Sequence, residues 1–134
     1  MSYDIELTDP VTGDTLELDG PHHMRGGTYQ VGGTMEAHLN VTYNYSSHYR
    51  RAFGHDEIKL DDFQRIFGGG ETGIRSIYGM TGAASIPVLR SAAAKLGDDV
   101  DQDYWKPTEG NAKRALLQLI ALAEMRPDGI WKGD

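Results

Sequence analysis

The sequence contains no cysteine, and this absence excludes several kinds of site together. Without thiols the chain can form no disulfide, no thiolate nucleophile and no cysteine-ligated zinc site. A nucleophile would have to be a hydroxyl, a lysine amine or a carboxylate.

Long apolar runs and basic clusters are missing as well. No stretch approaches the roughly 20 apolar residues that span a bilayer, and residues 1–6 show neither the basic nor the apolar part of a secretion signal. We therefore expect a cytoplasmic protein without a membrane partner. The net charge of −7 argues against general nucleic-acid binding, because phosphates are held by clustered lysines and arginines.

What the chain does contain fits one globular domain. Its 134 residues can bury a core without disulfides, and the proportions of hydrophobic residues (39%) and charged residues (25%) are ordinary for a soluble protein. No repeat or linker indicates a second unit. We predict a single domain over residues 1–134.

Residues 35–45 carry the most regular pattern in the chain, because apolar and polar residues alternate there without a break. Side chains of a strand point to opposite faces in turn, so this pattern predicts one long strand. Its core face would carry Met35, Ala37, Leu39, Val41, Tyr43 and Tyr45. The other face is rich in short groups that donate and accept hydrogen bonds, which indicates the wall of a site: Glu36, His38, Asn40, Thr42 and Asn44.

Strands are expected first and helices later. The alternation and turn residues near the start predict a hairpin, and caps and apolar stripes predict the helices. In chain order, the elements are a hairpin over 3–8 and 15–19, a short strand over 28–31, the long strand over 35–45, and helices over 46–53, 61–67, 85–96 and from Thr108 to a stop at 126–129. Ile130 and Trp131 should fold back onto the core. The fold class is α+β, an antiparallel sheet of N-terminal strands packed against C-terminal helices.

The polar row of the long strand is the first candidate ligand-binding surface, with His38, Asn40, Thr42 and Asn44. A metal site can also be drawn there with imidazole and carboxylate ligands, although the spacing is a weak pattern and we expect no cofactor. Its candidate ligands are His22, His23, Glu36 and His38.

A hydrolase with His38 as general base is disfavoured on distance. Thr42, one candidate nucleophile, would lie about 13 Å away along a strand that rises ~3.3 Å per residue. Ser46 is the other candidate, and the sequence offers no nucleophile elbow around either.

The predicted start of the last helix is the second candidate surface. Helix N-termini offer free amides and partial positive charge to anions, phosphates in particular, and an aromatic ring beside them can stack on a base. The candidate residues are Trp105, Lys106, Thr108, Asn111 and Arg114. In the competing interpretation, Trp105 fills the edge of the core and the basic side chains face water. Arg75 and Tyr78 form a third, smaller cluster.

Four segments resemble small uncharacterised proteins encoded by phages and prophages of bacteria. They are His23–Tyr29, His38–Tyr45, Gly73–Gly82 and Tyr104–Ala112. The resemblance covers most of the chain except about residues 49–72, which are longer here. It implies no established activity but a context, since small acidic phage proteins often act against host defence and some sequester nucleotide-like immune signals.

These observations lead to one hypothesis and two alternatives. We expect a non-enzymatic phage accessory protein that binds a small anionic, nucleotide-like ligand in the host cytoplasm, between the polar strand row and the segment from Trp105 to Arg114. The alternatives are a metal-dependent hydrolase and an acidic inhibitor that binds a host protein directly. An edge strand could also pair in a homo-oligomer. Packing of Asn40, Thr42 and Asn44 against the helix terminus, with no cavity between, would remove the main support for the ligand.

Overall fold

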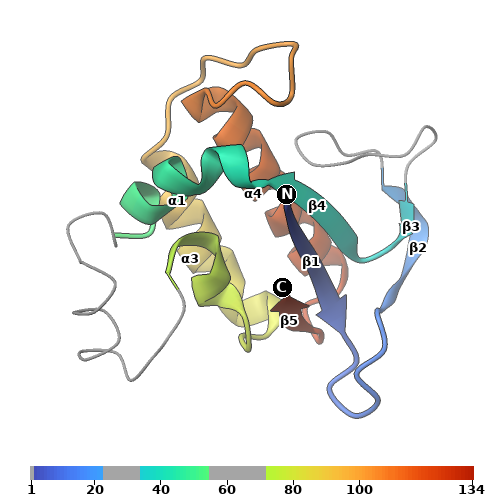
Figure 1. The fold of residues 1–134 in the computed structure, drawn as a ribbon. Coiled ribbons are helices and arrows are strands. Elements are labelled where there is room, and N and C mark those ends of the chain that lie inside the picture. The colour runs from blue at the N-terminus through green and yellow to red at the C-terminus, as the bar shows by residue number, and fades with distance from the viewer. Residues whose placement is uncertain (1, 23–33, 55–71) are drawn as a thin grey trace.

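The structure is a computed structural model, and it describes residues 2–22, 34–54 and 72–134. The elements are β1 (Ser2–Thr8), β2 (Glu17–His22), β3 (Thr34–Glu36), β4 (His38–Thr42), the 3₁₀ helix η1 (Tyr43–Tyr45), α1 (Ser46–Ala52), the 3₁₀ helix η2 (Gly73–Ile77), α3 (Gly82–Ala94), α4 (Glu109–Met125) and β5 (Ile130–Gly133). The predicted α+β class is confirmed (Figure 1). The predicted strand over 28–31 and helix over 61–67 lie outside the described residues.

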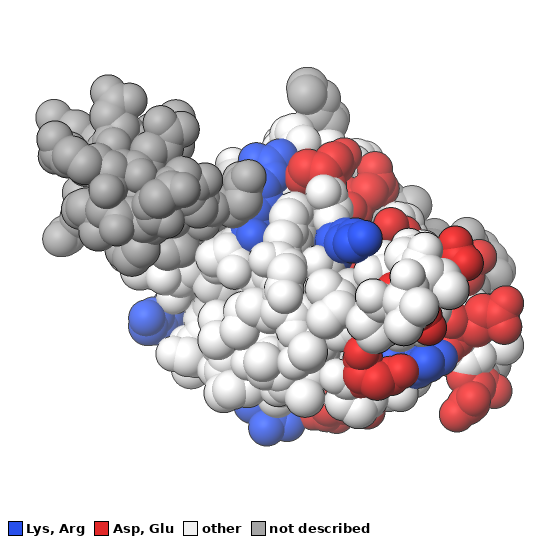
Figure 2. Space-filling model, turned by 90° about the horizontal axis from the view of Figure 1, so that it is seen from below, with Lys and Arg blue, Asp and Glu red and all other residues white. Residues whose placement is uncertain are grey.

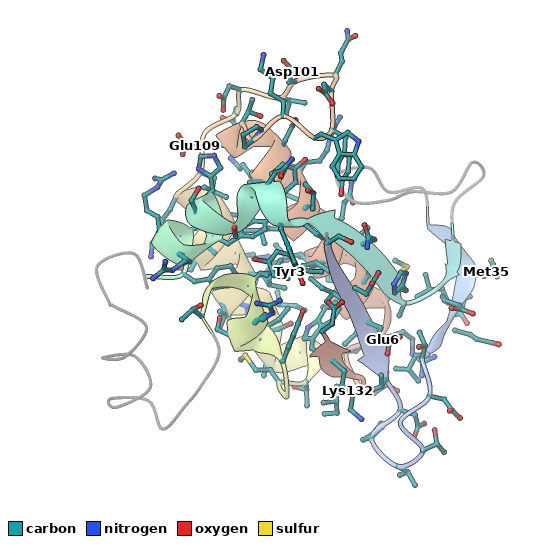
Figure 3. The ribbon with its side chains drawn as sticks, in the orientation of Figure 1. Tyr3, Glu6, Met35, Asp101, Glu109 and Lys132 are labelled. Carbon is teal, nitrogen blue, oxygen red and sulfur yellow. The ribbon has the colours of Figure 1, made fainter. Side chains whose placement is uncertain are left out.

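β1 is the middle strand of the main sheet, whose order is β4-β1-β5 with both pairings antiparallel. Along β1, Ile5 lies opposite Leu39 of β4 and Leu7 lies opposite Trp131 of β5, and all four side chains are buried. The outward positions are polar, as in the Glu6–Lys132 pair of β1 and β5 (Figure 3). The predicted return of the chain end to the core is therefore confirmed, in the form of a strand.

The predicted hairpin has the right turn and the wrong partner. Asp9 Oδ1 accepts hydrogen bonds from the Val11 N–H (2.8 Å) and the Thr12 N–H (3.0 Å), which closes the turn. After an isolated bridge between Thr8 and Thr15, the chain leaves the sheet, and β2 pairs with β3 in a separate two-stranded sheet. The prediction is wrong in its pairing because β4 and β5 occupy both edges of β1.

The prediction of one unbroken strand over 35–45 is also wrong. A bend at Ala37 separates β3 from β4, and Met35 is half exposed on β3 instead of lying in the core. At the other end, Thr42 Oγ1 accepts a hydrogen bond from the Asn44 N–H, and the Ser46 hydroxyl donates to the Tyr43 carbonyl. These local bonds offer the backbone an alternative to the strand, and the chain turns into η1.

The helices begin where side-chain caps are available. α3 starts three residues before the predicted Ser85, because Thr81 Oγ1 accepts a hydrogen bond from the Ala84 N–H. α4 is capped by Thr108 as predicted. The two helices pack against each other, and in Figure 1 α4 runs behind β1 and β4 while α3 lies beside the sheet. None of the helices in the described ranges is long and apolar enough to cross a membrane.

Ser85 is buried in α3, where it links the helix to β5. Its hydroxyl donates to the Gly82 carbonyl and accepts from the Trp131 indole N–H at 2.7 Å. Ser85→Ala should lower the free energy of unfolding by about 1–3 kcal/mol, because the buried indole N–H loses its acceptor. Urea denaturation measures this, with Ser91→Ala on the exposed side of α3 as the control. Equal midpoints for the two variants would contradict this role.

Candidate functional site

The polar row of the predicted strand does not form one wall. His38 and Asn40 point to the outer side of the sheet, toward β1. The Asn40 amide donates to Ser2 Oγ (2.6 Å) and Asp4 Oδ1 (2.7 Å), and His38 Nε2 lies 3.5 Å from the same Asp4 oxygen. These groups therefore serve cross-strand contacts between β4 and β1.

The other end of the row meets the Trp105 segment directly. The Asn44 amide donates to the Trp105 main-chain oxygen at 2.8 Å, while Thr42 is buried and caps η1. The Trp105 ring is 54% exposed and lies edge-on to Tyr104. The two surfaces thus come together, as the hypothesis required, but through a hydrogen bond where a ligand was expected.

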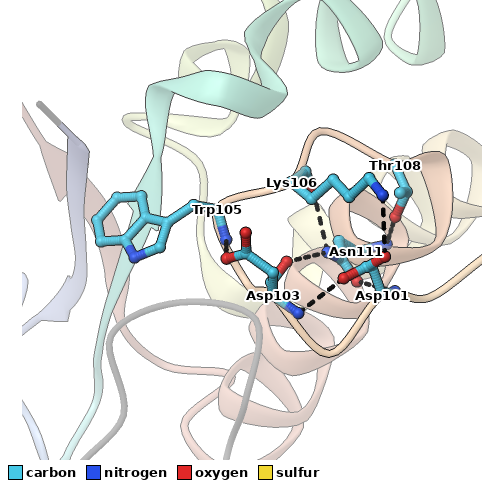
Figure 4. Close-up of polar contacts among 6 residues, drawn as sticks. All are labelled: Asp101, Asp103, Trp105, Lys106, Thr108 and Asn111. Atoms are coloured by element: carbon cyan, nitrogen blue, oxygen red, sulfur yellow. Dashed lines mark hydrogen bonds and ion pairs between the residues drawn. The ribbon is translucent and has the colours of Figure 1, made fainter.

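Asn111 holds the loop before α4 together. It is 2% exposed. Its Oδ1 accepts from the Asp101 N–H (2.9 Å), and its Nδ2 donates to the carbonyls of Asp103 (3.1 Å) and Lys106 (3.0 Å), as Figure 4 shows. Both ends of the amide are used inside the protein. Asn111 is accordingly placed as a clamp on residues 101–106.

Two amides at the start of α4 are also occupied by the protein. Asp99 Oδ1 accepts from the Gly110 N–H (3.0 Å), and Thr108 Oγ1 accepts from the Asn111 N–H (3.1 Å). Asp99 and Val100 press on the helix so closely that a Cβ on Gly110 would lie 2.5 Å from their backbone atoms. An aspartate of the chain therefore takes the position predicted for a ligand anion.

Two basic residues were predicted to contact a ligand at this helix. Lys106 forms an ion pair with Asp101 at 3.3 Å, and its side chain is mostly exposed. Arg114 is partly exposed on α4 and has no ion pair within the described residues. Neither basic residue lines the polar cavity described below.

The clamp predicts a loss of stability when Asn111 is truncated. Asn111→Ala should cost about 2–3 kcal/mol of unfolding free energy, because it removes three hydrogen bonds and leaves three main-chain groups of the loop without partners. Asn44→Ala, which removes one exposed bond, should cost less than about 1 kcal/mol. Denaturant titration of both variants gives the comparison, and an Asn111→Ala protein as stable as Asn44→Ala would show that the clamp is unimportant.

The loop is closed at its other side by Glu109. Its carboxylate accepts hydrogen bonds from Arg51 Nη2 (2.8 Å) and from the Gly97 N–H (3.3 Å). These bonds hold the pKa of Glu109 below its ordinary 4.5, and the bond from Arg51 has the larger effect. Figure 3 shows Glu109 at the start of α4, beside α1.

A lowered pKa in the folded state makes this contribution pH-dependent. As the pH falls, Glu109 takes up a proton in the unfolded chain before it does so in the folded one, so the stabilisation is complete above about pH 5.5 and is lost as the pH falls below 4.5 and through the folded-state pKa. Urea midpoints of wild type and Glu109→Gln should differ at about pH 7 and converge as the pH falls through the folded-state pKa of Glu109. Glu124→Gln, which alters a carboxylate on the exposed side of α4, serves as the control. A difference in urea midpoint between Glu109→Gln and wild type that does not change with pH would contradict this account.

Metal ligation finds little support in the described part of the chain. No group of three or more His, Asp or Glu side chains there could hold a metal ion. His38 lies beside Asp4, and Glu36 is exposed on β3. His23 and the side chain of His22 lie outside what the structure describes.

A polar cavity of about 250 Å³ lies where β1, η1, α1 and η2 meet. We call it the Arg75 pocket. It contains one of the predicted site residues, Arg75, while Tyr78 follows η2 directly and is not among the lining residues. None of the lining residues in the described part of the chain carries a carboxylate: they are Tyr3, Tyr43, Ser46, Arg50, Thr72, Gly73 and Arg75.

Local backbone chemistry brings these residues together. Gly73 has a φ of +59° and is buried against Tyr49 and Arg50, so a side chain at this position would be strained. From this glycine the chain winds into η2, whose turn is tied by the Ser76 hydroxyl donating to the Gly73 carbonyl at 2.7 Å. The turn carries Arg75 toward the rings of β1 and η1.

Arg75 is fixed at one side and open at the other. Its Nε donates to the Asp134 main-chain oxygen (2.8 Å) and its Nη2 donates to the Tyr43 hydroxyl (3.1 Å). The guanidinium carbon lies 4.9 Å from the centre of the Tyr3 ring and 5.5 Å from that of Tyr43, in cation–π range. A guanidinium has five N–H bonds, and three of those on Arg75 meet no acceptor among the described residues.

The hydroxyl groups add to this donor character. Because the Tyr43 oxygen accepts a hydrogen bond from Arg75, its own O–H bond is left to donate. Burial raises the pKa of Tyr3, with Arg75 opposing the shift, so the phenol stays protonated. The pocket thus offers N–H and O–H donors, which suit an anion.

The positive pocket belongs to an acidic protein. Figure 2 shows one face of the molecule, on which basic side chains lie singly and acidic ones gather toward one side. With a net charge of −7, attraction for an anion has to come from guanidinium groups at short range. Arg75 has no ion pair with a carboxylate among the described residues, in contrast to Arg51, Arg90 and Arg126.

The two tyrosines of this pocket were missed by sequence reasoning. Tyr43 was assigned to the core face of the long strand, and Tyr3 to the first strand of the hairpin. Only the register that places Tyr3 opposite Val41, together with the turn into η1, shows that the two rings meet at 4.5 Å beside Arg75. No sequence spacing connects these residues.

Comparisons with protein-family models, with curated proteins and with solved structures found no match for this chain. The geometry of the pocket is therefore the basis of the functional argument.

Proposed function

We propose that the protein binds a small anionic, nucleotide-like ligand without chemically changing it, and that the anionic group occupies the Arg75 pocket. The observation that carries the proposal is Arg75 itself. Its guanidinium is oriented by Asp134 and Tyr43 and stacked on aromatic rings. Both N–H bonds of Nη1 and one of Nη2 meet no acceptor among the described residues. Two neighbouring N–H bonds of this kind match the spacing of phosphate or carboxylate oxygens.

The surroundings of Arg75 favour an anion over a neutral ligand. Arg50 contributes a second guanidinium to the lining, and the Tyr43 hydroxyl contributes a donor. Among the described residues, no carboxylate belongs to the lining itself. Partial burial strengthens each of these contacts relative to bulk water.

The size of the cavity limits what it can enclose. Ligand pockets commonly measure about 300–1,000 Å³, and the Arg75 pocket at about 250 Å³ lies just below this range. It suits a phosphate with the group next to it, so the rest of a nucleotide would extend outside. The proposal thus moves the binding site from the Trp105 segment to Arg75.

The absence of catalysis is part of the proposal. Tyrosine acts as a nucleophile or base when its pKa is lowered toward neutrality, whereas burial raises the pKa of Tyr3. Arg75 holds charge but does not exchange protons near neutral pH. These groups are suited to holding an anion and leaving its bonds intact.

The biological setting that we propose is a phage accessory protein. It would act inside the bacterial host by sequestering a nucleotide-like signal of host defence. The resemblance of four segments to phage and prophage proteins supports this setting, and binding without turnover is the chemistry that sequestration needs. Pairing through the edge strand β4 would make a homo-oligomer within the same proposal.

Calorimetry with a panel of mononucleotides, cyclic mononucleotides and cyclic dinucleotides tests the proposal. At least one member should bind, and Arg75→Ala should weaken it at least tenfold, about 1.4 kcal/mol. Arg90→Ala removes an arginine that pairs with Glu124 outside the pocket and should leave the affinity unchanged. Recovery of intact ligand after binding checks that no reaction occurs. If no member binds, or if Arg75→Ala binds as well as wild type, the proposal fails.

A further inference from the structure

Arg75 is held by a residue distant from it in sequence. Asp134 follows β5, and its carboxylate oxygen Oδ1 accepts a hydrogen bond from the Asp4 N–H of β1 at 2.9 Å. Its main-chain oxygen accepts from Arg75 Nε at 2.8 Å. One residue therefore bridges the middle strand of the sheet and the guanidinium of the pocket.

The neighbouring residue explains how Asp134 reaches this place. A Cβ on Gly133 would collide with the Tyr78 hydroxyl and would lie 2.7 Å from the Asp4 main-chain oxygen. Glycine lets the chain pass between Tyr78 and β1, with Tyr78 packed over it. Tyr78 on one side and β1 on the other thereby fix the path of the backbone into Asp134.

We propose that Asp134 is a positioning residue for the Arg75 pocket, a role that rests on the proposed function. The Asp134 carboxylate, anchored on the Asp4 amide, holds the Asp134 main-chain oxygen in place, and that oxygen orients the Arg75 guanidinium. With Nε tied to Asp134 and Nη2 tied to Tyr43, the Nη1 end of the side chain is presented in a fixed direction. An arginine that is ordered before binding loses less conformational freedom when an anion arrives.

The charge of Asp134 has the opposite effect on an anion. A carboxylate close to the pocket repels a negatively charged ligand, whereas the anchoring bond needs only an acceptor oxygen. Asparagine at this position keeps an acceptor oxygen and removes the charge, and alanine removes both. The two substitutions therefore separate positioning from charge. If Asp134 acted through its charge alone, the protein would bind anions more tightly after either substitution.

Inorganic phosphate is the probe for the test, titrated into the full chain and followed by calorimetry. Asp134→Ala should weaken phosphate binding about fivefold or more, and Asp134→Asn should bind at least as tightly as wild type. Lys132→Ala, on the exposed side of β5, is the matched control and should have no effect. Positioning is overturned if Asp134→Ala binds as tightly as wild type, or if Asp134→Asn is weakened as much as Asp134→Ala.

A second measurement without any ligand separates this inference from the proposed function. In nitrogen-15 spectra, the Arg75 Nε–H should exchange slowly with solvent in wild type and Asp134→Asn, and quickly in Asp134→Ala. If phosphate does not bind to wild type while this pattern holds, the proposed anion site fails and the orientation of Arg75 by Asp134 stands. Equal exchange in all three proteins would overturn the positioning role, whatever the phosphate titration shows.

Discussion

The antiparallel pairing of β1 on both of its edges is the constraint on which the rest of the structure depends. One edge takes β4 and the other takes β5, so the first, middle and last parts of the chain meet on one strand. Through this pairing Tyr3 comes to lie beside Tyr43, and Asp134 comes within reach of Asp4. The Arg75 pocket is built around these two contacts, because η2 then adds the guanidinium between them. Without the central strand none of these residues would be neighbours.

Two places in the described part of the molecule suit an anion, and they differ in what already occupies them. At the start of α4 the amides of Gly110 and Asn111 are taken by Asp99 and Thr108, and the loop that reaches them is held by Asn111. At Arg75 the protein supplies two acceptors that orient the guanidinium. The other N–H bonds of Arg75 have no acceptor within the described chain. A helix terminus that is already capped contributes to stability, whereas an oriented cation with spare donors is suited to binding. This difference is the physical reason for preferring the Arg75 pocket.

Local signals in the sequence were read correctly where one residue decides the structure. Thr108 begins α4, and the chain after the last helix returns so that Trp131 is buried, both as predicted. The long strand failed because alternation alone cannot show that Thr42 will cap a turn. The hairpin failed because a sequence shows which segments are strands but not which of them compete for the same edge.

The candidate site was only partly predictable for the same reason. Asn111 is an amide residue at the start of a helix, which suits ligand binding. The neighbouring sequence does not reveal that three main-chain groups of the loop will bond to its side-chain amide. Arg75 was recognised as a candidate, but its partners Tyr43 and Asp134 lie far away in sequence and meet it only in the folded chain. Convergence of this kind depends on strand register, which a single sequence does not specify.

Nuclear magnetic resonance mapping with adenosine monophosphate tests the central claim most directly, because it reports where an anionic ligand sits. The account predicts that the largest shift changes fall on the Arg75 Nε–H and on the amides of Thr72 and Gly73, with little change at Asn111 and Trp105. Changes concentrated at the start of α4, with η2 unaffected, would contradict it.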